Sequence, residues 1–259
     1  MQPTALPHFL RRAVLGYAGF GASLLYCVGR VLHGTLTDAH DDATVDISRD
    51  TARVMARLTC AGAEISVRVV DEHYITAAQP CVYVVNHQSF VDYPILATIF
   101  PARTAIVGKA EIGRLPLIGW LFRATGHVLL ARGDRRRASN TLRQLVHSVT
   151  QNGQSIWMFP EGTRRRTADA MLPFKTGAFR VAAAAGVPIV PIVVSSLAPA
   201  IDLARRRVEP TTITIRVLAP RFVSNDEGQL RATIDETRTE MVRVYDDITH
   251  HEAMSRATE

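Results

Sequence analysis

The sequence predicts an α/β fold with a mostly parallel central sheet flanked by helices, preceded by an N-terminal membrane-associated helix. The first indication is a series of short, nearly all-apolar runs, as expected of strands that are buried on both faces. The second is that helical patterns separate several of these runs, which is typical of a parallel sheet. The third is a single long apolar segment close to the N-terminus.

The composition is that of an ordered chain. Of the 259 residues, 47% are hydrophobic and 21% are charged, which excludes disorder as the main state. The mean hydropathy of +0.07 is too low for a protein that crosses a membrane many times. No Pro/Gly/Ser-rich linker and no internal repeat follows residue 60. We therefore expect an N-terminal segment with a polar connector, residues 1–50, and one large domain, residues 51–259.

The apolar segment of residues 13–29 carries no charge and is flanked by Arg11, Arg12 and Arg30. As a helix it would be about 25 Å long, slightly shorter than a ~30 Å hydrocarbon core. No small-x-small cleavage site precedes Arg30, so we expect the segment to be retained rather than removed as a signal peptide. Three interpretations stay open: a helix lying in one leaflet, a spanning helix, and an ordinary buried helix.

The predicted strands and helices alternate along the rest of the chain. Strands are predicted over residues 64–70, 81–85, 104–107, 127–131, 155–159, 188–194 and 212–218. Helices are predicted over residues 51–60, 139–151, 177–185 and 227–250. In such folds the reactive side chains collect where strands end at the carboxyl edge of the sheet. The residues directly after the apolar runs are therefore the candidates for a functional site.

A histidine and an aspartate follow the run of residues 81–85, in the sequence Asn86-His87-Gln88-Ser89-Phe90-Val91-Asp92. Within one regular helix, five positions correspond to about 140°, so His87 and Asp92 would point apart. If His87 instead precedes a helix that Ser89 caps, Asp92 in the first turn can bond to the imidazole and support a general base. The alternative is a structural histidine that bonds to an aspartate at a helix start.

A stretch suited to phosphate follows the run of residues 155–159. It begins Pro160-Glu161-Gly162-Thr163-Arg164-Arg165-Arg166, and Leu172-Pro173-Phe174-Lys175-Thr176-Gly177 comes shortly after it. Glycine permits close approach, a hydroxyl and free N–H groups can donate, and arginine offers a bidentate fork. Glu161 could orient an arginine or a substrate hydroxyl. A polar surface loop is the alternative. Neither G-x-x-x-x-G-K-[ST] nor G-x-S-x-G occurs, which disfavours P-loop nucleotide chemistry and an α/β-hydrolase nucleophile.

Together the two motifs resemble those of the 1-acylglycerol-3-phosphate acyltransferase family, the lysophosphatidic acid acyltransferases. The similarity covers roughly residues 64–195 and includes Val107-Gly108-Lys109, Pro116-x-x-Gly119, Arg132, Phe174-Lys175-x-Gly177 and Val187-Pro188-Ile189-Val190-Pro191. The resemblance implies a transferase that moves an acyl chain from acyl-CoA, or from acyl carrier protein, to the free hydroxyl of 1-acyl-glycerol-3-phosphate and so makes phosphatidic acid. Residues 51–259 would then be the acyltransferase catalytic domain.

The resemblance also implies residue roles. His87 would deprotonate the acceptor hydroxyl, and Asp92 would orient His87. The residues expected to bind substrate are Asn86, Ser89, Lys109, Arg132, Glu161, Gly162, Thr163, Arg164 and Lys175. The family's middle motif commonly reads Phe-Ile-Asp-Arg, whereas this chain has Leu129-Leu130-Ala131-Arg132 and lacks the acidic residue. No metal and no cofactor is implied; acyl-CoA or acyl carrier protein is the acyl-donor substrate.

Charge and cysteine content bear on partners and location. A net charge of +6 with several arginine clusters fits nucleic acid, a membrane surface or anionic substrates. No aromatic residues are interleaved with these clusters, which disfavours nucleic acid. The three cysteines lack C-x-x-C spacing, so we expect a reducing compartment. The expected partners are lysophospholipid and acyl-thioester substrates, a membrane lipid surface and, as the alternative donor, acyl carrier protein. The catalytic domain would be membrane-associated and face the cytoplasm.

Two alternatives to this function stay open. The first is an acyltransferase that acts on another lyso-lipid acceptor, for example lyso-ornithine lipid or another lysophospholipid. The second is a non-catalytic membrane-surface binding protein that uses the arginine clusters alone.

Overall fold

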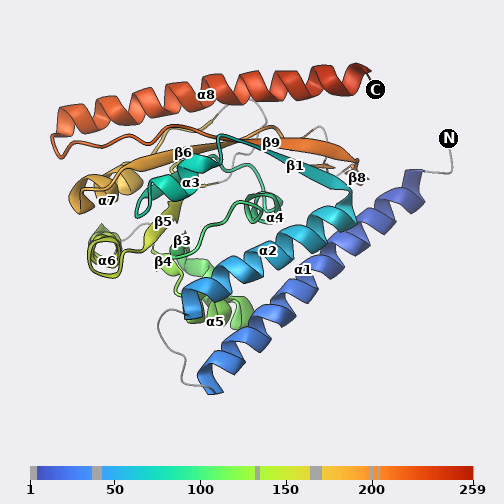
Figure 1. Ribbon diagram of the computed structural model, residues 1–259, viewed down its shortest axis with the longest axis horizontal. Helices are drawn as coiled ribbons and strands as arrows, with labels where there is room; N and C mark the ends of the chain where they lie inside the picture. The colour runs from blue at the N-terminus through green and yellow to red at the C-terminus, as the bar shows by residue number, and fades with distance from the viewer. Residues whose placement is uncertain are drawn as a thin grey trace.

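The computed structural model describes residues 5–36, 43–131, 135–163, 171–198, 201–202 and 205–258. A 7-stranded sheet with the strand order β1-β9-β6-β2-β5-β3-β4 forms the centre of the molecule (Figure 1). Its strands are β1 (Ile65–Val70), β2 (Val82–Val85), β3 (Thr104–Lys109), β4 (Val128–Leu130), β5 (Ser155–Met158), β6 (Ile189–Val194) and β9 (Thr211–Val217). A separate 2-stranded sheet pairs β7 (Ile201–Asp202) with β8 (Arg207–Val208). Each predicted strand is present, and the predicted α/β fold is confirmed.

The helices lie on both faces of the sheet. They are α1 (Ala5–Leu36), α2 (Ala43–Ala63), α3 (His73–Ala77), α4 (Asp92–Leu96), the 3-10 helix η1 (Ala110–Arg114), α5 (Pro116–Ala124), α6 (Arg135–Asn152), α7 (Gly177–Ala185) and α8 (Glu227–Thr258). Figure 1 shows α8 along one side of the sheet and the α1–α2 pair on the opposite side. Helix α2 begins at Ala43 rather than at residue 51. Much of the expected polar connector is therefore helical.

The sheet is parallel except at one junction. Strands β4, β3, β5, β2 and β6 run parallel, whereas β9 pairs antiparallel with β6, with Val194 opposite Ile215. Strand β1 pairs parallel with β9. As a result, β2, β5 and β6 end at the same edge of the sheet, where the two predicted motifs meet.

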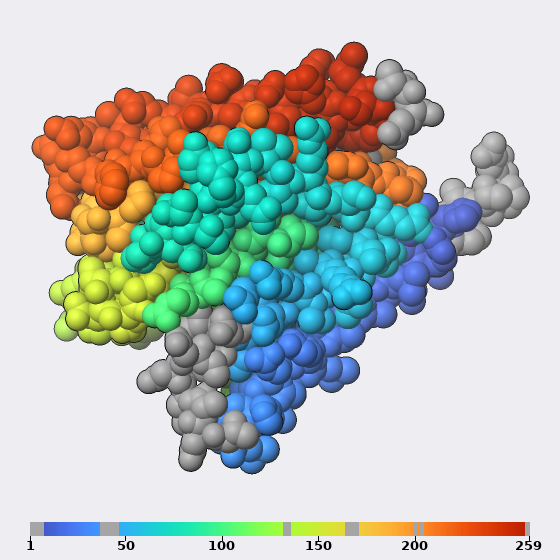
Figure 2. All heavy atoms as spheres, viewed as in Figure 1, coloured from blue at the N-terminus to red at the C-terminus, as the bar shows by residue number. Residues whose placement is uncertain are grey.

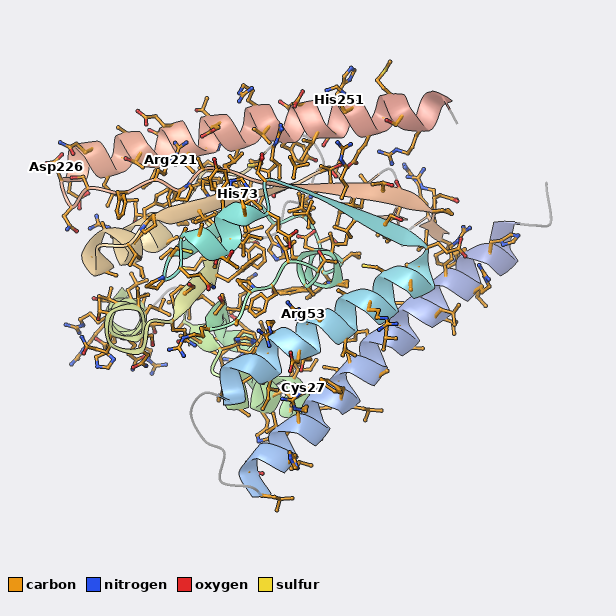
Figure 3. All side chains as sticks on the ribbon, viewed as in Figure 1. Cys27, Arg53, His73, Arg221, Asp226 and His251 are labelled. Carbon is orange, nitrogen blue, oxygen red and sulfur yellow. The ribbon has the colours of Figure 1, made fainter. Side chains whose placement is uncertain are left out.

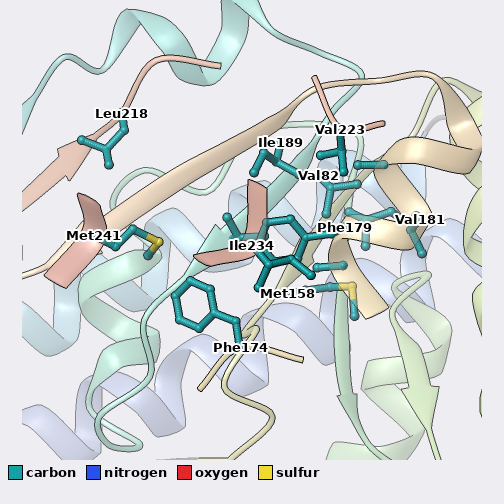
Figure 4. Close-up of a cluster of buried hydrophobic side chains, with 14 of the residues drawn as sticks. Val82, Met158, Phe174, Phe179, Val181, Ile189, Leu218, Val223, Ile234 and Met241 are labelled. Carbon is teal, nitrogen blue, oxygen red and sulfur yellow. The ribbon is translucent and has the colours of Figure 1, made fainter. Parts of the chain in front are cut away.

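Side chains of the strands point alternately to the two faces of the sheet, and each face has its own hydrophobic core. Val82 and Val84 of β2 join a buried cluster with α6, α7 and α8, and Figure 4 shows Val82 beside Ile189 and Phe179. Tyr83 and Val85 point to the other face and pack with residues of α2 and α4. This period of two, with both faces covered, is why the strands are apolar throughout.

Helices α1 and α2 form an antiparallel pair whose backbones approach closely (Figure 1). A Cβ at Gly19 would lie 2.7 Å from the carbonyl carbon of Leu58, and a Cβ at Gly62 would lie 2.7 Å from that of Leu15. Gly19 of α1 and Gly62 of α2 therefore permit the close approach of the two helices. The stretch His8–Leu36 is long and apolar enough to cross a membrane, and 28% of its most apolar window is buried.

Candidate active site

The end of β2 carries a buried histidine–aspartate pair. His87 follows the strand in a short loop, and Asp92 is the first residue of α4. The Nδ1 atom of His87 lies 2.7 Å from Oδ2 of Asp92, and the Asp92 side chain is fully buried whereas that of His87 is 11% exposed. Because Nδ1 is engaged, Nε2 is the imidazole nitrogen left to exchange a proton.

Asp92 also shapes the loop that holds the histidine. Its Oδ2 accepts hydrogen bonds from the backbone N–H groups of Gln88 at 2.6 Å and Ser89 at 3.0 Å. The expected helix cap by Ser89 is wrong in detail: the N-cap position is Val91 and has no side-chain cap. The Ser89 hydroxyl instead accepts from the Val91 N–H at 3.0 Å, which tightens the turn before the helix.

Two aromatic rings enclose the imidazole. The Phe159 ring stacks on that of His87 with centroids 4.1 Å apart at 22°. The Tyr93 ring meets His87 edge-on, with centroids 6.0 Å apart at 79°. These rings exclude water from the buried side of the pair, which strengthens the electrostatic interaction between imidazole and carboxylate.

Glu161 joins the two motifs. Its carboxylate accepts the backbone N–H of His87 at 2.8 Å through Oε1 and the backbone N–H of Leu172 at 2.9 Å through Oε2. The residue is 2% exposed, although its cationic sequence context resembles a surface loop. The sequence predicted contact with substrate, whereas both oxygens bond to protein backbone, and charge-assisted bonds of this kind are strong.

The loop after β5 wraps back over Gly162. The backbone N–H of Lys175 donates to the Pro160 carbonyl at 2.7 Å. Gly162 has φ +73°, a left-handed conformation that favours glycine, and the Lys175 side chain packs over its Cα, so an added Cβ would lie 3.4 Å from Lys175 Cγ. Thr163 and Lys175 are exposed. This loop offers a hydroxyl and an ammonium group beside the His87 loop.

Asn86 and Gln88, on either side of His87, bind the end of β6. The Asn86 amide donates to the Val194 carbonyl at 3.0 Å and accepts the Val194 N–H at 2.8 Å. Gln88 Nε2 donates to the Ser195 carbonyl at 2.9 Å. Asn86 is fully buried, so it holds the loop rather than facing a ligand. The sequence analysis did not select Gln88, because nothing in the sequence shows that β6 lies next to β2.

The other predicted residues are distributed around this centre. Lys109 ends β3, which lies beyond β5 from β2 in the sheet. Arg132 and Arg164 lie outside the described residues. Within the described ranges, no group of three or more His, Cys, Asp and Glu side chains is placed to hold a metal ion.

An apolar cavity of about 120 Å³ adjoins the pair. Phe159 and Tyr93, which contact His87, also form part of its wall. Its lining is Cys27, Ser48, Thr51, Ala52, Met55, Tyr93, Leu96, Ala97, Phe100, Ile106, Thr125, His127, Trp157 and Phe159. Cys27 marks the place where α1 reaches the wall (Figure 3). The cavity thus extends from the imidazole toward the α1–α2 pair.

His127 contributes an imidazole ring to this wall. It lies between Phe100 and Phe122, with ring centroids 6.2 Å and 4.8 Å away, and its Nδ1 accepts the Ile106 N–H at 3.2 Å. Burial in these apolar surroundings lowers the pKa of His127 to about 4, because the charged form loses its hydration. The ring is therefore neutral at pH 7.

Comparison with known proteins assigns the family. A family model described as Acyltransferase matches residues 66–195, a range that holds both motifs and the strands that carry them. The chain therefore belongs to the Acyltransferase family. The predicted resemblance is confirmed.

Named relatives agree with this assignment. The 1-acyl-sn-glycerol-3-phosphate acyltransferase of Haemophilus influenzae is 44% identical over 135 residues, 52% of this chain and 55% of that protein. The enzyme of the same name from Saccharomyces cerevisiae is 32% identical over 196 residues, 75% of this chain and 64% of that protein. The matches thus span between about half and two thirds of these relatives.

A solved structure shares the fold. The crystal structure of a 1-acyl-sn-glycerophosphate acyltransferase from Thermotoga maritima matches with a TM-score of 0.70 at 24% identity, covering 91% of this chain and 96% of that chain.

Proposed function

We propose that this chain transfers an acyl group from an acyl thioester to the free hydroxyl of 1-acyl-glycerol-3-phosphate, which makes phosphatidic acid. The observation that carries the proposal is the His87–Asp92 pair, bonded through Glu161 to the loop of the second motif and bordered by an apolar cavity. The names of the relatives point to the same acceptor.

In this proposal His87 is the general base. Its Nε2 accepts the proton of the acceptor hydroxyl while that oxygen attacks the thioester carbonyl carbon. The new C–O bond forms, the C–S bond breaks, and the proton passes from Nε2 to the departing thiolate. Asp92 holds the required tautomer through Nδ1 and stabilises the imidazolium that forms. The reaction uses no metal and no cofactor besides the acyl donor, which is acyl-CoA or acyl carrier protein.

The proposed acceptor site is the loop after β5. Thr163 and Lys175 offer hydroxyl and ammonium donors, and Gly162 permits close approach of the acceptor to the backbone. We assign the predicted guanidinium groups of Arg132 and Arg164 to the same phosphate. We also assign Lys109 at the end of β3 and Ser89 in the His87 loop to substrate binding. Asn86 and Glu161 act by fixing the loops rather than by direct contact.

The apolar cavity supports a substrate with a hydrocarbon tail. It begins at Phe159 and Tyr93, beside the imidazole, and most of its wall is apolar. We assign an acyl chain to this cavity, because burial of methylene groups yields about 0.8 kcal/mol each.

Exposed apolar side chains support a membrane surface as partner. They are Leu10, Val14, Leu15, Tyr17, Leu25, Leu32 and Leu36 on α1, and Leu115, Leu117, Ile118 and Trp120 in and beside α5. Patches of this kind mark interaction surfaces. Figure 2 shows α1 along one edge of the molecule and α8 along another. We assign residues 1–50 to the membrane and residues 51–259 to catalysis on its cytoplasmic side; the boundary falls within α2.

The test of the function is release of free thiol from acyl-CoA with and without 1-acyl-glycerol-3-phosphate. We expect release that depends on the acceptor. Acyl carrier protein replaces CoA in a parallel assay and identifies the donor. Release that is unchanged by the acceptor, or protein that binds anionic vesicles without consuming thioester, would contradict the proposal.

One observation favours testing a second acceptor. Ala131 precedes Arg132 where the family motif commonly has an acidic residue, and we assign Arg132 to the acceptor phosphate. Lyso-ornithine lipid and lysophospholipids with larger head groups, compared in the same assay, would reveal a preference for another head group.

A further inference from the structure

We propose that Glu252 of α8 is a positioning residue for catalysis, because it fixes the end of β6 to which both neighbours of His87 are bonded. The inference rests on the proposed function, since His87 is the base in it. Glu252 lies well beyond residues 66–195, the range that the family model matches.

The carboxylate of Glu252 is buried against the sheet. The residue is 8% exposed, and its Oε1 accepts from the Ser195 hydroxyl at 2.6 Å and from the Thr214 N–H at 2.5 Å. Its neighbour His251 lies on the outer side of α8 (Figure 3) with a 78% exposed side chain. Two consecutive residues of the helix therefore have opposite environments, and the carboxylate is the one turned inward.

The contact falls where β6 separates from β9. Ser195 is the first residue after β6, and its N–H donates to the Thr214 carbonyl of β9 at 3.0 Å. The next N–H, of Ser196, donates to the hydroxyl of Thr249 on α8 at 3.0 Å. The segment of residues 195–197 is thus fastened to α8 by one carboxylate and one hydroxyl, one helical turn apart.

The same segment binds the His87 loop on its other side. Gln88 Nε2 donates to the Ser195 carbonyl at 2.9 Å, and Gln88 Oε1 accepts the Leu197 N–H at 3.3 Å. Asn86 bonds in both directions to Val194. The backbone of residues 194–197, with hydrogen bonds on both sides, therefore links Glu252 to the two residues that flank the imidazole.

The consequence is a fixed backbone on either side of His87. Catalysis by a positioned base is sensitive to displacements of about 1 Å, which can cost on the order of 10²-fold in rate. The burial of an ionised carboxylate is unfavourable unless its hydrogen bonds compensate. The nearest cation is Arg256, whose Nη2 is 3.7 Å from Glu252 Oε2. Oε2 accepts no hydrogen bond within the described residues, so the bonds that Oε1 accepts from Ser195 and Thr214 are the hydrogen bonds through which Glu252 acts.

The test compares Glu252→Ala with Glu252→Gln and a control on the same helix. The control is Glu240→Gln, because Glu240 pairs with Arg221 away from the β6 end. We expect Glu252→Ala to lower kcat for thiol release about 10²-fold with the acceptor KM changed less than about threefold. Glu252→Gln should recover most of kcat, because an amide oxygen can accept the same two bonds, and Glu240→Gln should match the wild type.

A second readout does not depend on turnover. In histidine-labelled protein, the nitrogen resonances of His87 report its tautomer and its bond to Asp92, and Glu252→Ala should shift them whereas Glu240→Gln should not. Should Glu252→Ala fail to fold, Ser195→Ala removes one link of the chain and is expected to lower kcat about tenfold.

The results of these experiments distinguish failure of the proposed function from failure of the positioning role of Glu252. Wild-type protein without acceptor-dependent thiol release contradicts the proposed function, whatever the His87 resonances show. An active wild type with folded Glu252→Ala at full kcat and unchanged His87 resonances overturns the positioning role. The same holds if Glu252→Gln loses as much activity as Glu252→Ala at equal folded fraction.

Discussion

The carboxyl edge of the sheet and the N-terminal helix pair are stabilised in opposite ways. At the sheet edge, the buried side chains of Glu161 and Asn86 bond to the backbone of distant segments, and that of Asp92 bonds to the backbone of the His87 loop. In the helix pair, backbones approach at Gly19 and Gly62, and much of the α1 surface remains apolar and exposed. Directional hydrogen bonds fix the position of a reacting group, whereas close packing of small residues leaves the outward surface of α1 apolar and exposed.

The two regions meet at the apolar cavity. Phe159 and Tyr93 belong to the ring cluster around His87, while Cys27 and Met55 come from α1 and α2. An acyl chain in the cavity would therefore contact both regions. The comparison predicts that changes at the polar edge reduce turnover most, and that changes in the helix pair act mainly on stability.

The largest effect is expected from Asp92→Asn. The substitution removes the negative charge of the carboxylate that bonds to His87 Nδ1 and to two backbone N–H groups, so the imidazolium formed during proton transfer loses its stabilisation. Turnover in the thiol-release assay should fall by about 10² to 10⁴. Asp226→Asn is the control, because Asp226 Oδ1 accepts the Gln229 N–H at the start of α8, where asparagine serves equally well. Equal loss in both variants would contradict the assignment.

The next effect concerns stability and pH. The pKa of His127 in the folded protein is about 4, below its ordinary value of 6.5. As pH falls, His127 is therefore protonated in the unfolded chain at a higher pH than in the folded protein. Stability is therefore lost as pH falls from about 6.5 to about 4, by as much as about 3 kcal/mol. Denaturation as a function of pH should show a smaller loss in His127→Asn, whose Oδ1 can accept the Ile106 N–H. His147→Gln, at an exposed position of α6, should follow the wild type; identical curves for wild type and His127→Asn would refute this prediction.

A smaller effect is expected from Glu161→Gln. One of its two bonds to backbone N–H groups is lost, and a hydrogen bond to a charged group is worth about 1.5–3 kcal/mol. Without this bond the His87 backbone is held less firmly, and kcat should fall about 10- to 100-fold. The control Glu227→Gln removes the charge of an exposed residue that pairs with Arg180. Full activity of Glu161→Gln would show that the link between the two loops is dispensable.

The smallest effect is a difference in stability between alanine substitutions at two glycines of α1. Gly19→Ala brings a Cβ to 2.7 Å from the Leu58 backbone, whereas Gly21→Ala meets no atom within 4 Å. The first change should lower the free energy of unfolding by about 1–3 kcal/mol, and the second should raise it by up to about 1 kcal/mol. Thermal denaturation measures both, and equal shifts in Tm would mean that the helices do not depend on close approach at Gly19.

Much of the sheet could be predicted from the sequence, because strands buried on both faces are continuous apolar runs. The direction of β9 could not, since an antiparallel strand buried on both faces has the same pattern; only the pairing of Val194 with Ile215 reveals it. The extent of α1 was also underestimated. Arg11, Arg12 and Arg30 flank the apolar segment and suggested its boundaries, whereas all three lie within α1. They pair with Glu64, which follows α2, and with Asp50 of α2.

The site was predicted in outline. The position of Asp92 at a helix start followed from its spacing to His87, because only that geometry brings the carboxylate back to the ring. The burial of Glu161 and Asn86 was not predicted, because their partners, Leu172 and Val194, come from distant segments. Gln88 and Glu252 were missed for the same reason. Arg132 and Arg164 lie outside the described residues, and their roles stay predictions.

The most direct measurement is the amount of phosphatidic acid formed from acyl-CoA and 1-acyl-glycerol-3-phosphate by wild-type protein and by His87→Ala, followed by mass spectrometry. We expect acceptor-dependent product from the wild type and a rate lower by about 10² to 10⁴ in folded His87→Ala. Near-normal product formation by His87→Ala, or none by the wild type, would contradict the proposal that this imidazole activates the lipid hydroxyl.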